Sequence, residues 1–595
     1  MAATARDLMT SPVHGVPPET TISEAHAQLS RSRHGAIPIV VAERPVGLAL
    51  ANDIERADRH GLGDRPVGEI AIEALVVTPE APLDAVIAGL APPGIGRVLV
   101  VEDERLVGYI ARSDLVDYLY GASSPGSAEG IPARHGRRQL DAAALLMDRW
   151  EAGNLALLRE IGRAAGDRPL FLVGGAVRDL LLERPSYDLD LMALGDGIAV
   201  AYRLQKHVGG KLTIHEPFGT ATLELPDGRR LDVATARSER YESPGALPDT
   251  RPGALLADLE RRDFTINAMA MRVDPASWAR IVDPFGGMAD LAAGSLRTLH
   301  NLSVLEDPAR LVRGVRFERQ LGFRLERTTE HFARYLLSTG RLDGIGGERI
   351  RLELKKLLAL AGPEASVGRL ADLDGLRLIS SELARSGPAV SGAGALAALG
   401  RVDDVLALAN TAWTPAGEQQ DSCRANGQAL VADAGVVRFR VALAVLLSRI
   451  GAGARQAAAE ALHLAGREAR AVLVAAERGG ALARRLEDLG DVRPSQRYEA
   501  LRPELLETLV MATAIAPEAR TELVLEHLRS RHLRLTGLDG HWLQAQGLPP
   551  GPELGHILTQ TLAAVLDGQV LGPEAERAFA LQRVRERTQA DPPAR

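Results

Sequence analysis

The 595-residue sequence contains very little cysteine and lysine and no long apolar run. A single cysteine, Cys423, excludes an intramolecular disulfide and a zinc site made of several cysteines. No stretch approaches the ~18 uninterrupted apolar residues that cross a bilayer, and the first residues lack the apolar core of a signal peptide. We therefore expect a soluble cytoplasmic protein without a membrane partner. Because only four of its 70 basic residues are lysines, any basic surface must consist almost entirely of arginine.

The length and the uneven charge point to several domains with different partners. At 595 residues the chain is too long for one hydrophobic core. Residues 1–120 hold 10 basic and 17 acidic residues, a difference of −7 that equals the net charge of the whole chain. Residues 301–360 hold 12 basic and 8 acidic residues, a difference of +4. A nucleic-acid ligand is expected to contact this basic section and to avoid the acidic N-terminal part.

The acidic N-terminal part is an internal repeat. An offset of 61 residues aligns Val46-Gly47 with Val107-Gly108, and Asp53 with Asp114. Each copy reads as a short opening strand, a helix, two strands and a closing helix, and a fixed period implies two copies of one packing unit. The following segment, 121–138, has the Gly, Ser and Pro content of a linker, which predicts a loose tether to the rest of the chain.

The most informative stretch is Phe171 to Asp190. An apolar run ends in Gly174-Gly175 and opens a helix, and an alternating strand then carries Asp188 and Asp190. Residues two apart on a strand share a face, so both carboxylates can meet one site. Hard carboxylates near a glycine turn that opens a helix suit Mg²⁺ and a polyphosphate. Each motif alone is usually turn chemistry, but their order within twenty residues favours nucleotidyl transfer on two metal ions.

Further motifs downstream resemble those of class II tRNA nucleotidyltransferases and bacterial poly(A) polymerases. The segments that carry the resemblance are FLVGGAVRDLLLERPSYDLD at 171–190, RLDVATARSERY at 230–241, DLERRDFTINAMA at 258–270, DPFGGMADL at 283–291, EDPARLVRGVRFERQLGF at 306–323 and GGERIRLELKKLL at 346–358. The resemblance is close over residues 140–358 and looser over 530–585. The N-terminal repeat resembles a pair of CBS domains.

The resemblance implies an α+β multidomain fold. We expect tandem CBS domains, a linker, a polymerase-β-like nucleotidyltransferase head with a mixed sheet and helices, a neck of base-selecting helices, and a helical body and tail that bind tRNA. The expected bounds of these parts are 1–120, 121–140, 141–295, 296–360 and 361–595, in that order.

The same resemblance assigns the metal and triphosphate sites. Asp188 and Asp190 would hold two Mg²⁺ ions, and Asp232 on another strand would be a third catalytic carboxylate. The alternative for Asp232 is an acidic residue on the outer face of an edge strand. The residues expected to contact the triphosphate are Gly174, Gly175, Arg178 and Arg262.

Arg262 lies beside the residues that the resemblance assigns to positioning. Residues Phe264 to Met271 read as a helix, and two arginines at a helix start oppose its macrodipole, which indicates an anion there. Asp263 and Asn267 would position the sugar and the loop of the motif itself. Asp263 also reads as a simple helix N-cap.

Base selection is assigned by resemblance to Asp307, Arg310 and Arg313. Asp307 and Arg310 are three residues apart at a helix start, so they share a face. A carboxylate acceptor beside a guanidinium donor can read the amino groups and ring nitrogens of cytosine and adenine. The alternative is that Asp307 and Pro308 form a helix N-cap with proline in the first turn.

The CBS resemblance leaves two readings. CBS pairs often bind an adenine nucleotide through the pattern Gly-x-x-Thr/Ser-x-x-Asp, whose Asp holds the ribose. Asp53 and Asp114 occupy this acidic position, but Leu50 and Ala111 replace both hydroxyl residues. The pair is therefore either an adenine-nucleotide site or a structural or homodimerising element, with the two aspartates as helix N-caps.

Together these features predict a template-independent nucleotidyltransferase. It would add CCA, or its terminal A, to the 3′ end of tRNA from CTP and ATP, with two Mg²⁺ ions. A poly(A) polymerase, whose motifs are almost the same, is the first alternative. An alternative from another class is a CBS-based sensor of adenine nucleotides whose transferase is vestigial.

Overall fold

The computed structural model describes residues 4–31, 35–90, 97–111, 114, 146, 152–166, 168–184, 189–216, 219–240, 249–342, 345–386, 393–413, 434–516, 520–530 and 534–590. Asp188, Cys423 and the expected linker at 121–140 lie outside them. The chain forms two compact units, Met1–Gly346 and Gly347–Arg595. Among the described residues, none of the helices combines the length and the apolar character that a membrane span needs.

The N-terminal repeat folds into two matching hairpins. β1 (Ala36–Val41) pairs antiparallel with β2 (Arg44–Leu50), and 61 residues later β4 (Arg97–Glu102) pairs with β5 (Arg105–Ala111). The same irregularity in register occurs in both, between Ile39 and Val40 and between Val100 and Val101. The expected duplication therefore extends to the details of the backbone.

The helices and turns of this module repeat as well. α2 (Ile22–Arg31) and α4 (Leu83–Leu90) begin 61 residues apart. Each hairpin turns through two non-glycine residues with positive φ, at Ala42-Glu43 and at Asp103-Glu104, a conformation that L-residues seldom adopt. The remaining elements of the module are α1 (Ala5–Leu8), α3 (Ala51–Ala57), η1 (Asp58–Leu62), η2 (Val67–Ile70) and β3 (Leu75–Val77).

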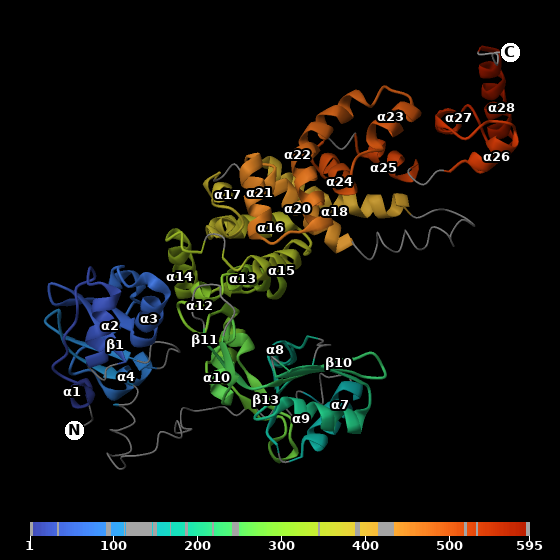
Figure 1. Cartoon of the computed structure of the whole chain (residues 1–595). Helices are drawn as coiled ribbons and strands as arrows, with labels where there is room; N and C mark the ends of the chain where they lie inside the picture. Colours follow the sequence, from blue (N-terminus) through green and yellow to red (C-terminus); the bar gives the residue numbers. More distant parts are fainter. Residues whose placement is uncertain are drawn as a thin grey trace. The chain divides into compact units, whose positions relative to one another are not determined.

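The head contains the expected mixed sheet. Its seven strands lie in the order β14-β13-β6-β7-β10-β9-β8, and helices α7 (Ala152–Ala165) and α9 (Gly197–Val208) pack together beside it (Figure 1). β7 and β10 are parallel, whereas the other neighbouring pairs are antiparallel. The strands are β6 (Leu170–Val173), β7 (Leu189–Ala193), β8 (Lys211–His215), β9 (Thr220–Glu224), β10 (Arg230–Thr235), β13 (Ala270–Arg272) and β14 (Ile281–Val282).

The segment after Asp263 differs from its prediction. A helix was expected over Phe264 to Met271, but only a single 3₁₀ turn, Thr265–Asn267, forms before the chain enters β13. Ala270 pairs with Val173 of β6, and the residues from Ala268 to Met271 are fully buried. A strand that is buried on both faces is an uninterrupted apolar run, and periodicity alone does not separate it from a buried helix.

The neck follows as three helices, α12 (Ser303–Glu306), α13 (Ala309–Leu321) and α14 (Arg327–Ser338). α13 packs closely over the segment after Asp263. A Cβ at Gly314 would lie 3.1 Å from Cζ of Phe264 and 3.0 Å from Cδ2 of Leu325, so a larger residue would push the helix away. This glycine lets α13 approach the head.

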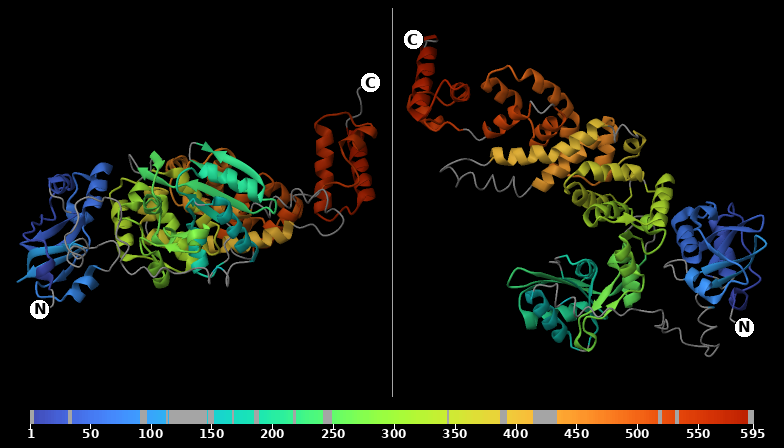
Figure 2. Two further views of the ribbon diagram at one scale, coloured as in Figure 1. Left: turned by 90° about the horizontal axis from the view of Figure 1, so that it is seen from below. Right: turned by 180° about the vertical axis from the view of Figure 1, so that it is seen from behind.

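The second unit is helical throughout its described residues (Figure 2). Its centre is α24, which is buried continuously from Glu507 to Ala514 and packs against α22. A smaller core of Leu538, Leu543, Ile557 and Ala580 stabilises the tail. The helices are α15 (Gly347–Leu358), α16 (Pro363–Asp372), α17 (Ser381–Arg385), α18 (Ala393–Trp413), α20 (Ala434–Leu447), α21 (Ala452–Ala461), α22 (Gly466–Asp488), α23 (Pro494–Leu501), α24 (Leu506–Ile515), α25 (Thr521–Ser530), α26 (Gly540–Ala545), α27 (Pro552–Leu566) and α28 (Pro573–Ala590).

Candidate active site

Asp190 and Asp232 lie side by side on the parallel strands β7 and β10. Their Cα atoms are register partners, so both carboxylates lie on the same face of the sheet. Asp190 is the one exposed residue of β7. Oδ1 of Asp232 accepts hydrogen bonds from Oγ1 of Thr222 at 2.6 Å and from Nη2 of Arg230 at 3.2 Å. Since β10 lies between β7 and β9, the alternative that placed Asp232 on an edge strand is wrong.

The glycine turn and Arg262 meet this face of the sheet. Gly174 has a φ of +70°, and a Cβ there would lie 3.0 Å from Nη1 of Arg262 and 3.9 Å from Oδ2 of Asp190. Both the positive φ and the close approach require glycine. The structure thus brings one expected metal ligand and two expected triphosphate contacts to one place.

Asp258 is a site residue that the sequence analysis missed. From α10 (Leu255–Glu260), its buried carboxylate binds Nη2 of Arg261 at 2.7 Å and Nη2 of Arg262 at 3.0 Å. Burial would raise the pKa of Asp258, but the charges of the two arginines outweigh it and lower that pKa. The anion expected at these arginines is therefore at least partly a residue of the chain itself. Asp258 precedes Arg261 and Arg262 by three and four residues, a spacing that brings side chains together on a helix. This spacing was the signal in the sequence.

Arg262 nevertheless keeps unused binding capacity. Its Nε is buried and, among the described residues, has no hydrogen-bond partner. Buried polar groups without partners are rare and often indicate an absent ligand. The atom of this guanidinium that faces Gly174 is Nη1.

Arg178 and Asn267 belong to a chain of hydrogen bonds that ends at Asp263. Nε and Nη2 of Arg178 donate to the two carboxylate oxygens of Asp179 at 2.8 and 3.0 Å. Nη1 of Arg178 donates to Oδ1 of Asn267 at 2.9 Å. Asn267 in turn donates from Nδ2 to Oδ1 of Asp263, also at 2.9 Å. Arg178 is thus held by protein partners on several sides.

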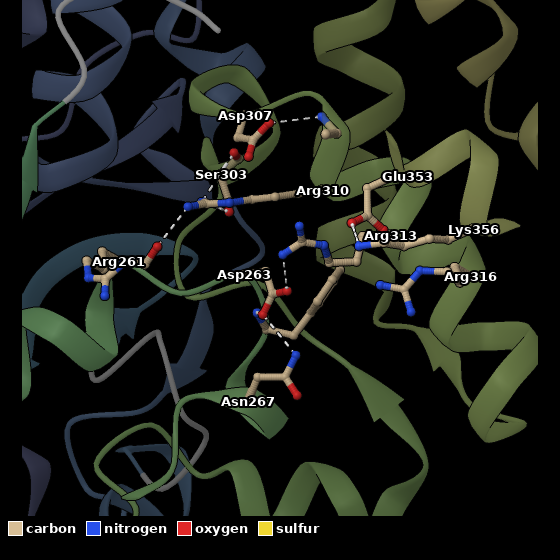
Figure 3. Close-up of polar contacts among 12 residues, drawn as sticks. Arg261, Asp263, Asn267, Ser303, Asp307, Arg310, Arg313, Arg316, Glu353 and Lys356 are labelled. Atoms are coloured by element: carbon tan, nitrogen blue, oxygen red, sulfur yellow. Dashed lines mark hydrogen bonds and ion pairs between the residues drawn. The ribbon is translucent and has the colours of Figure 1, made fainter. Parts of the chain in front are cut away.

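Asp263 connects this chain to the neck. Nη1 of Arg313, on α13, lies 2.9 Å from Oδ2 of Asp263, and the amide of Phe264 donates to Oδ1 at 2.7 Å (Figure 3). Burial would raise the pKa of Asp263, but the charge of Arg313 and these hydrogen bonds outweigh it and lower the pKa. Asp263 caps no helix, since only a 3₁₀ turn follows it.

Arg310 connects α13 to the same strip of the head. Its side chain is 4% exposed, and Nη2 donates to the backbone carbonyl oxygen of Arg261 at 2.8 Å. Nη1 donates to Oγ of Ser303 at 2.5 Å (Figure 3). Asp307 is also buried, and its Oδ1 accepts from the amide of Ala309 at 3.1 Å, although the N-cap position of α13 is Pro308 and not Asp307.

The face with Asp190 and Asp232 can bind a divalent cation. Two oxygen ligands from adjacent strands and an exposed position match the ligands that Mg²⁺ prefers. In the part of the chain that the structure describes, no group of three or more His, Cys, Asp or Glu side chains is arranged for a metal. Asp188, the other expected ligand, lies outside that part.

The two CBS aspartates have different surroundings. Asp114 accepts a hydrogen bond from the amide of Ala111, three residues earlier, at 2.7 Å, whereas an N-cap side chain accepts from an amide that follows it, so this bond is not that of an N-cap residue. Asp53 lies within the first turn of α3, whose N-cap is Leu50, so its expected capping role is wrong. The Asp53 carboxylate is instead buried and accepts from Nδ2 of Asn301 at 2.7 Å. Burial raises the pKa of Asp53 to about 6, although the Asn301 bond opposes this.

Comparison with known proteins identifies two domain types. The family model of the poly A polymerase head domain matches residues 170–297. The family model of the CBS domain matches residues 5–60 and 67–121. Both expected resemblances are therefore confirmed.

Whole-chain comparisons extend this result. The A-adding tRNA nucleotidyltransferase of Geobacter sulfurreducens is 33% identical over 599 aligned positions, which cover 97% of this chain and 64% of that protein. The CC-adding tRNA nucleotidyltransferase of Deinococcus radiodurans is 37% identical over 265 positions, which cover 43% of this chain and 70% of that protein. A solved CCA-adding enzyme in an apo form is 28% identical with a TM-score of 0.61, covering 74% of this chain and 99% of that one.

The alignments cover only part of the length of several relatives. The chain spans 64% of the Geobacter protein, 52% of the A-adding tRNA nucleotidyltransferase of Halalkalibacterium halodurans and 23% of that of Aquifex aeolicus.

The raised pKa of Asp53 predicts a pH-dependent stability. A folded-state pKa of about 6 lies above the ordinary value of 3.8, so the stability contributed by the neutral form is complete below 3.8 and is lost as the pH rises through 6. The loss amounts to at most about 3 kcal/mol. Asp53→Asn should therefore raise the melting temperature at pH 7.5, and raise it by only about half as much at pH 5, because the loss runs from pH 3.8 to pH 6.

The exposed Asp64, in the same module, provides the control. Asp64→Asn should leave the melting temperature unchanged at both pH values. A lower melting temperature of Asp53→Asn at pH 7.5 would mean that Asp53 is charged and stabilising.

Proposed function

This chain belongs to the tRNA nucleotidyltransferase family, and we propose that it adds the terminal A, or the whole CCA sequence, to the 3′ end of tRNA from ATP and CTP. The observation that carries the proposal is the in-register pair Asp190 and Asp232 facing Gly174 and Arg262. Nucleotidyl transfer needs carboxylates beside a triphosphate-binding turn, and no covalent nucleophile.

The relatives favour addition of A. The Geobacter protein, which aligns with nearly the whole chain, is named A-adding, and so are the Halalkalibacterium and Aquifex relatives. The CC-adding relative and a multifunctional CCA protein align over 43% and 36% of this chain, and the solved CCA-adding enzyme covers 74% of it at 28% identity, so the preference for A rests on the Geobacter protein. A poly(A) polymerase differs in how many residues it adds, which the residues of the site do not specify.

Asp190 and Asp232, with Asp188, are proposed to hold two Mg²⁺ ions. When bound, these ions lower the pKa of the attacking 3′-hydroxyl and neutralise charge on the triphosphate and the leaving pyrophosphate. The hydrogen bond from Thr222 and the ion pair with Arg230 orient the carboxylate of Asp232.

Arg262 is proposed to bind the triphosphate together with the backbone of Gly174 and Gly175. Asp258 orients its guanidinium by accepting from Nη2, while Nη1 faces Gly174, where it can meet a phosphate oxygen. An arginine held in this way loses little side-chain entropy when the anion binds. Arg178, held by Asp179 and Asn267, supports the same site from α8 (Gly175–Leu181).

Asp307 and Arg310 are proposed to read the base. Arg310 has five N–H donors, and its contacts with Ser303 and Arg261 use three of them at most. Arg310 bonds Ser303 and Arg261, and Asp307 bonds the amide of Ala309. These bonds fix both side chains before a nucleotide arrives. Arg313 would act indirectly, because it holds Asp263.

One assay tests the proposed function. The protein is incubated with tRNA transcripts that end at the discriminator base, at C or at CC, with each NTP in turn, and the 3′ ends are sequenced. We expect a single A on the CC-ending transcript. Addition of CCA to the shortest transcript would indicate the CCA-adding form, long A tails a poly(A) polymerase, and no addition a vestigial transferase.

The carboxylates give the second test. Asp190→Ala, Asp232→Ala and Asp188→Ala should each reduce nucleotide addition at least about 100-fold, or ~3 kcal/mol in the barrier, because the charge on the triphosphate is no longer neutralised. Binding of tRNA should persist. Asp227→Ala, an exposed aspartate before β10, is the control and should retain activity. Residual activity above about a hundredth in any site variant would contradict its assignment.

Base reading gives the third test. Asp307→Ala and Arg310→Ala should lower the preference for the added nucleotide over the other NTPs by about 1–3 kcal/mol, the value of a hydrogen bond to a charged group. Glu318→Ala is the control, since this buried residue of α13 accepts a hydrogen bond from the amide of Leu325, and its removal should lower the melting temperature without changing the nucleotide preference. The N-cap reading predicts that all three variants melt earlier with unchanged nucleotide preference.

A further inference from the structure

A second cluster of buried charges lies where the N-terminal module contacts the neck. The side chain of Glu306 is 10% exposed and lies 3.0 Å from Nε2 of His300, 3.5 Å from Nε of Arg56 and 3.9 Å from Nε2 of His60. Burial would raise the pKa of Glu306, but His300 and Arg56 outweigh it and lower that pKa. A buried carboxylate of this kind is strongly destabilising once a charged partner is removed. Arg56 and His60 belong to the module, so the neck depends on it here.

Two further contacts involve the same surfaces. Nδ2 of Asn301 donates to Oδ2 of Asp53 at 2.7 Å, and the hydroxyl of Tyr335 donates to Oε2 of Glu69 at 2.7 Å. A cavity of about 570 Å³ is lined by residues of both parts. Asp53 occupies the position at which the CBS pattern places a ribose ligand, and its carboxylate binds the neck instead. The linker at 121–138 was expected to hold the module loosely, but the module and the neck are also joined by direct side-chain contacts.

The short helix α12 connects this surface to the base-reading residues. Its last residue, Glu306, directly precedes Asp307. Its first residue, Ser303, is fully buried and accepts the hydrogen bond from Arg310 at 2.5 Å. All four residues of α12 are buried, and a close-packed interior transmits a shift at one end of such a turn to the other end. Displacement of Glu306 would therefore shift both Asp307 and the partner of Arg310.

Arg56 also reaches the end of α10. Its Nη2 lies 3.6 Å from Oε1 of Glu260, the residue that directly precedes Arg261. Arg261 supplies the carbonyl oxygen that Arg310 binds. Arg56 thus contacts Glu260 and Glu306. These two residues directly precede Arg261 and Asp307, which both belong to the proposed base site.

We propose that Arg56 and His60 are positioning residues for nucleotide selection, which act by holding Glu306 and with it α12. In this protein the CBS pair serves as a support for the base-selecting neck. The proposal rests on the proposed base-reading role of Asp307 and Arg310.

The test compares variants of the full-length protein. Arg56→Ala should reduce the ratio of kcat/KM for the added nucleotide to that for the other NTPs by roughly two- to thirtyfold, the range of coupling along packed networks. A purely structural role would lower turnover with every NTP by one factor and leave this ratio unchanged. Arg56→Lys, which keeps the charge without the planar fork, should give a smaller loss and secures a folded variant.

Arg59→Ala is the matched control. Arg59 lies three residues after Arg56 and pairs with Glu55 inside the module, so its removal should leave the ratio unchanged. A ratio that is unaffected by Arg56→Ala, or that changes equally in Arg59→Ala, overturns the proposal.

Hydrogen exchange separates this proposal from the proposed function. The amides of residues 303–310 should exchange faster in Arg56→Ala than in the wild type or in Arg59→Ala. Unchanged exchange would overturn the link between Arg56 and the neck, whatever the activity. A wild-type protein that adds no nucleotide to any tRNA would instead contradict the proposed function, while the exchange result still decides the link.

Discussion

The attachment of α13 to residues 261–263 is the contact on which the rest of the proposed site depends. Arg310 binds the carbonyl oxygen of Arg261, and Arg313 binds the carboxylate of Asp263. Between these two anchors lies Arg262, the arginine that faces Gly174. Because the strip is held from the neck, the triphosphate contact and the base-reading contact share one rigid segment. A nucleotide that fits the proposed base site would thereby be aligned with the proposed metal-binding face.

Buried carboxylates paired with arginine recur through this unit. Asp258, Asp263 and Glu306 are each nearly inaccessible, and each has at least one guanidinium partner. Isolation of such a charge from water would cost several kcal/mol, so removal of one partner leaves the other uncompensated. Arginine suits this task because it stays charged and bonds in a fixed planar fork. The scarcity of lysine therefore has no cost at these positions.

The two CBS repeats show how one sequence position acquires two roles. Asp53 and Asp114 are equivalent in the repeat, and their hairpins share even an irregularity in register. Asp114 bonds the backbone of its own repeat, whereas Asp53 is buried against Asn301 of the neck. The local sequence is similar, but only the first repeat contributes this contact. Burial raises the pKa of Asp53 to about 6, and the opposing effects of the Asn301 bond and the charge of Arg56 are too small to cancel it.

The sequence by itself determined the local elements and the type of chemistry. The strand before Gly174, the 61-residue repeat and the paired aspartates follow from short-range patterns, and they were sufficient to predict the family and a mixed sheet. Tertiary structure decided what depends on distant partners. It placed Asp232 beside Asp190 on an interior strand and turned an expected helix into β13.

Contacts between segments far apart in the chain were likewise decided by the tertiary structure. In the folded chain, Glu306 pairs with Arg56 of the N-terminal module, which lies 250 residues earlier in the sequence. Strand pairs and buried ion pairs join residues that are far apart in the chain. A strand that is buried on both faces also lacks the alternation of polar and apolar residues by which strands are recognised in a sequence. The sequence therefore named most of the chemical groups, and the fold decided which of them meet.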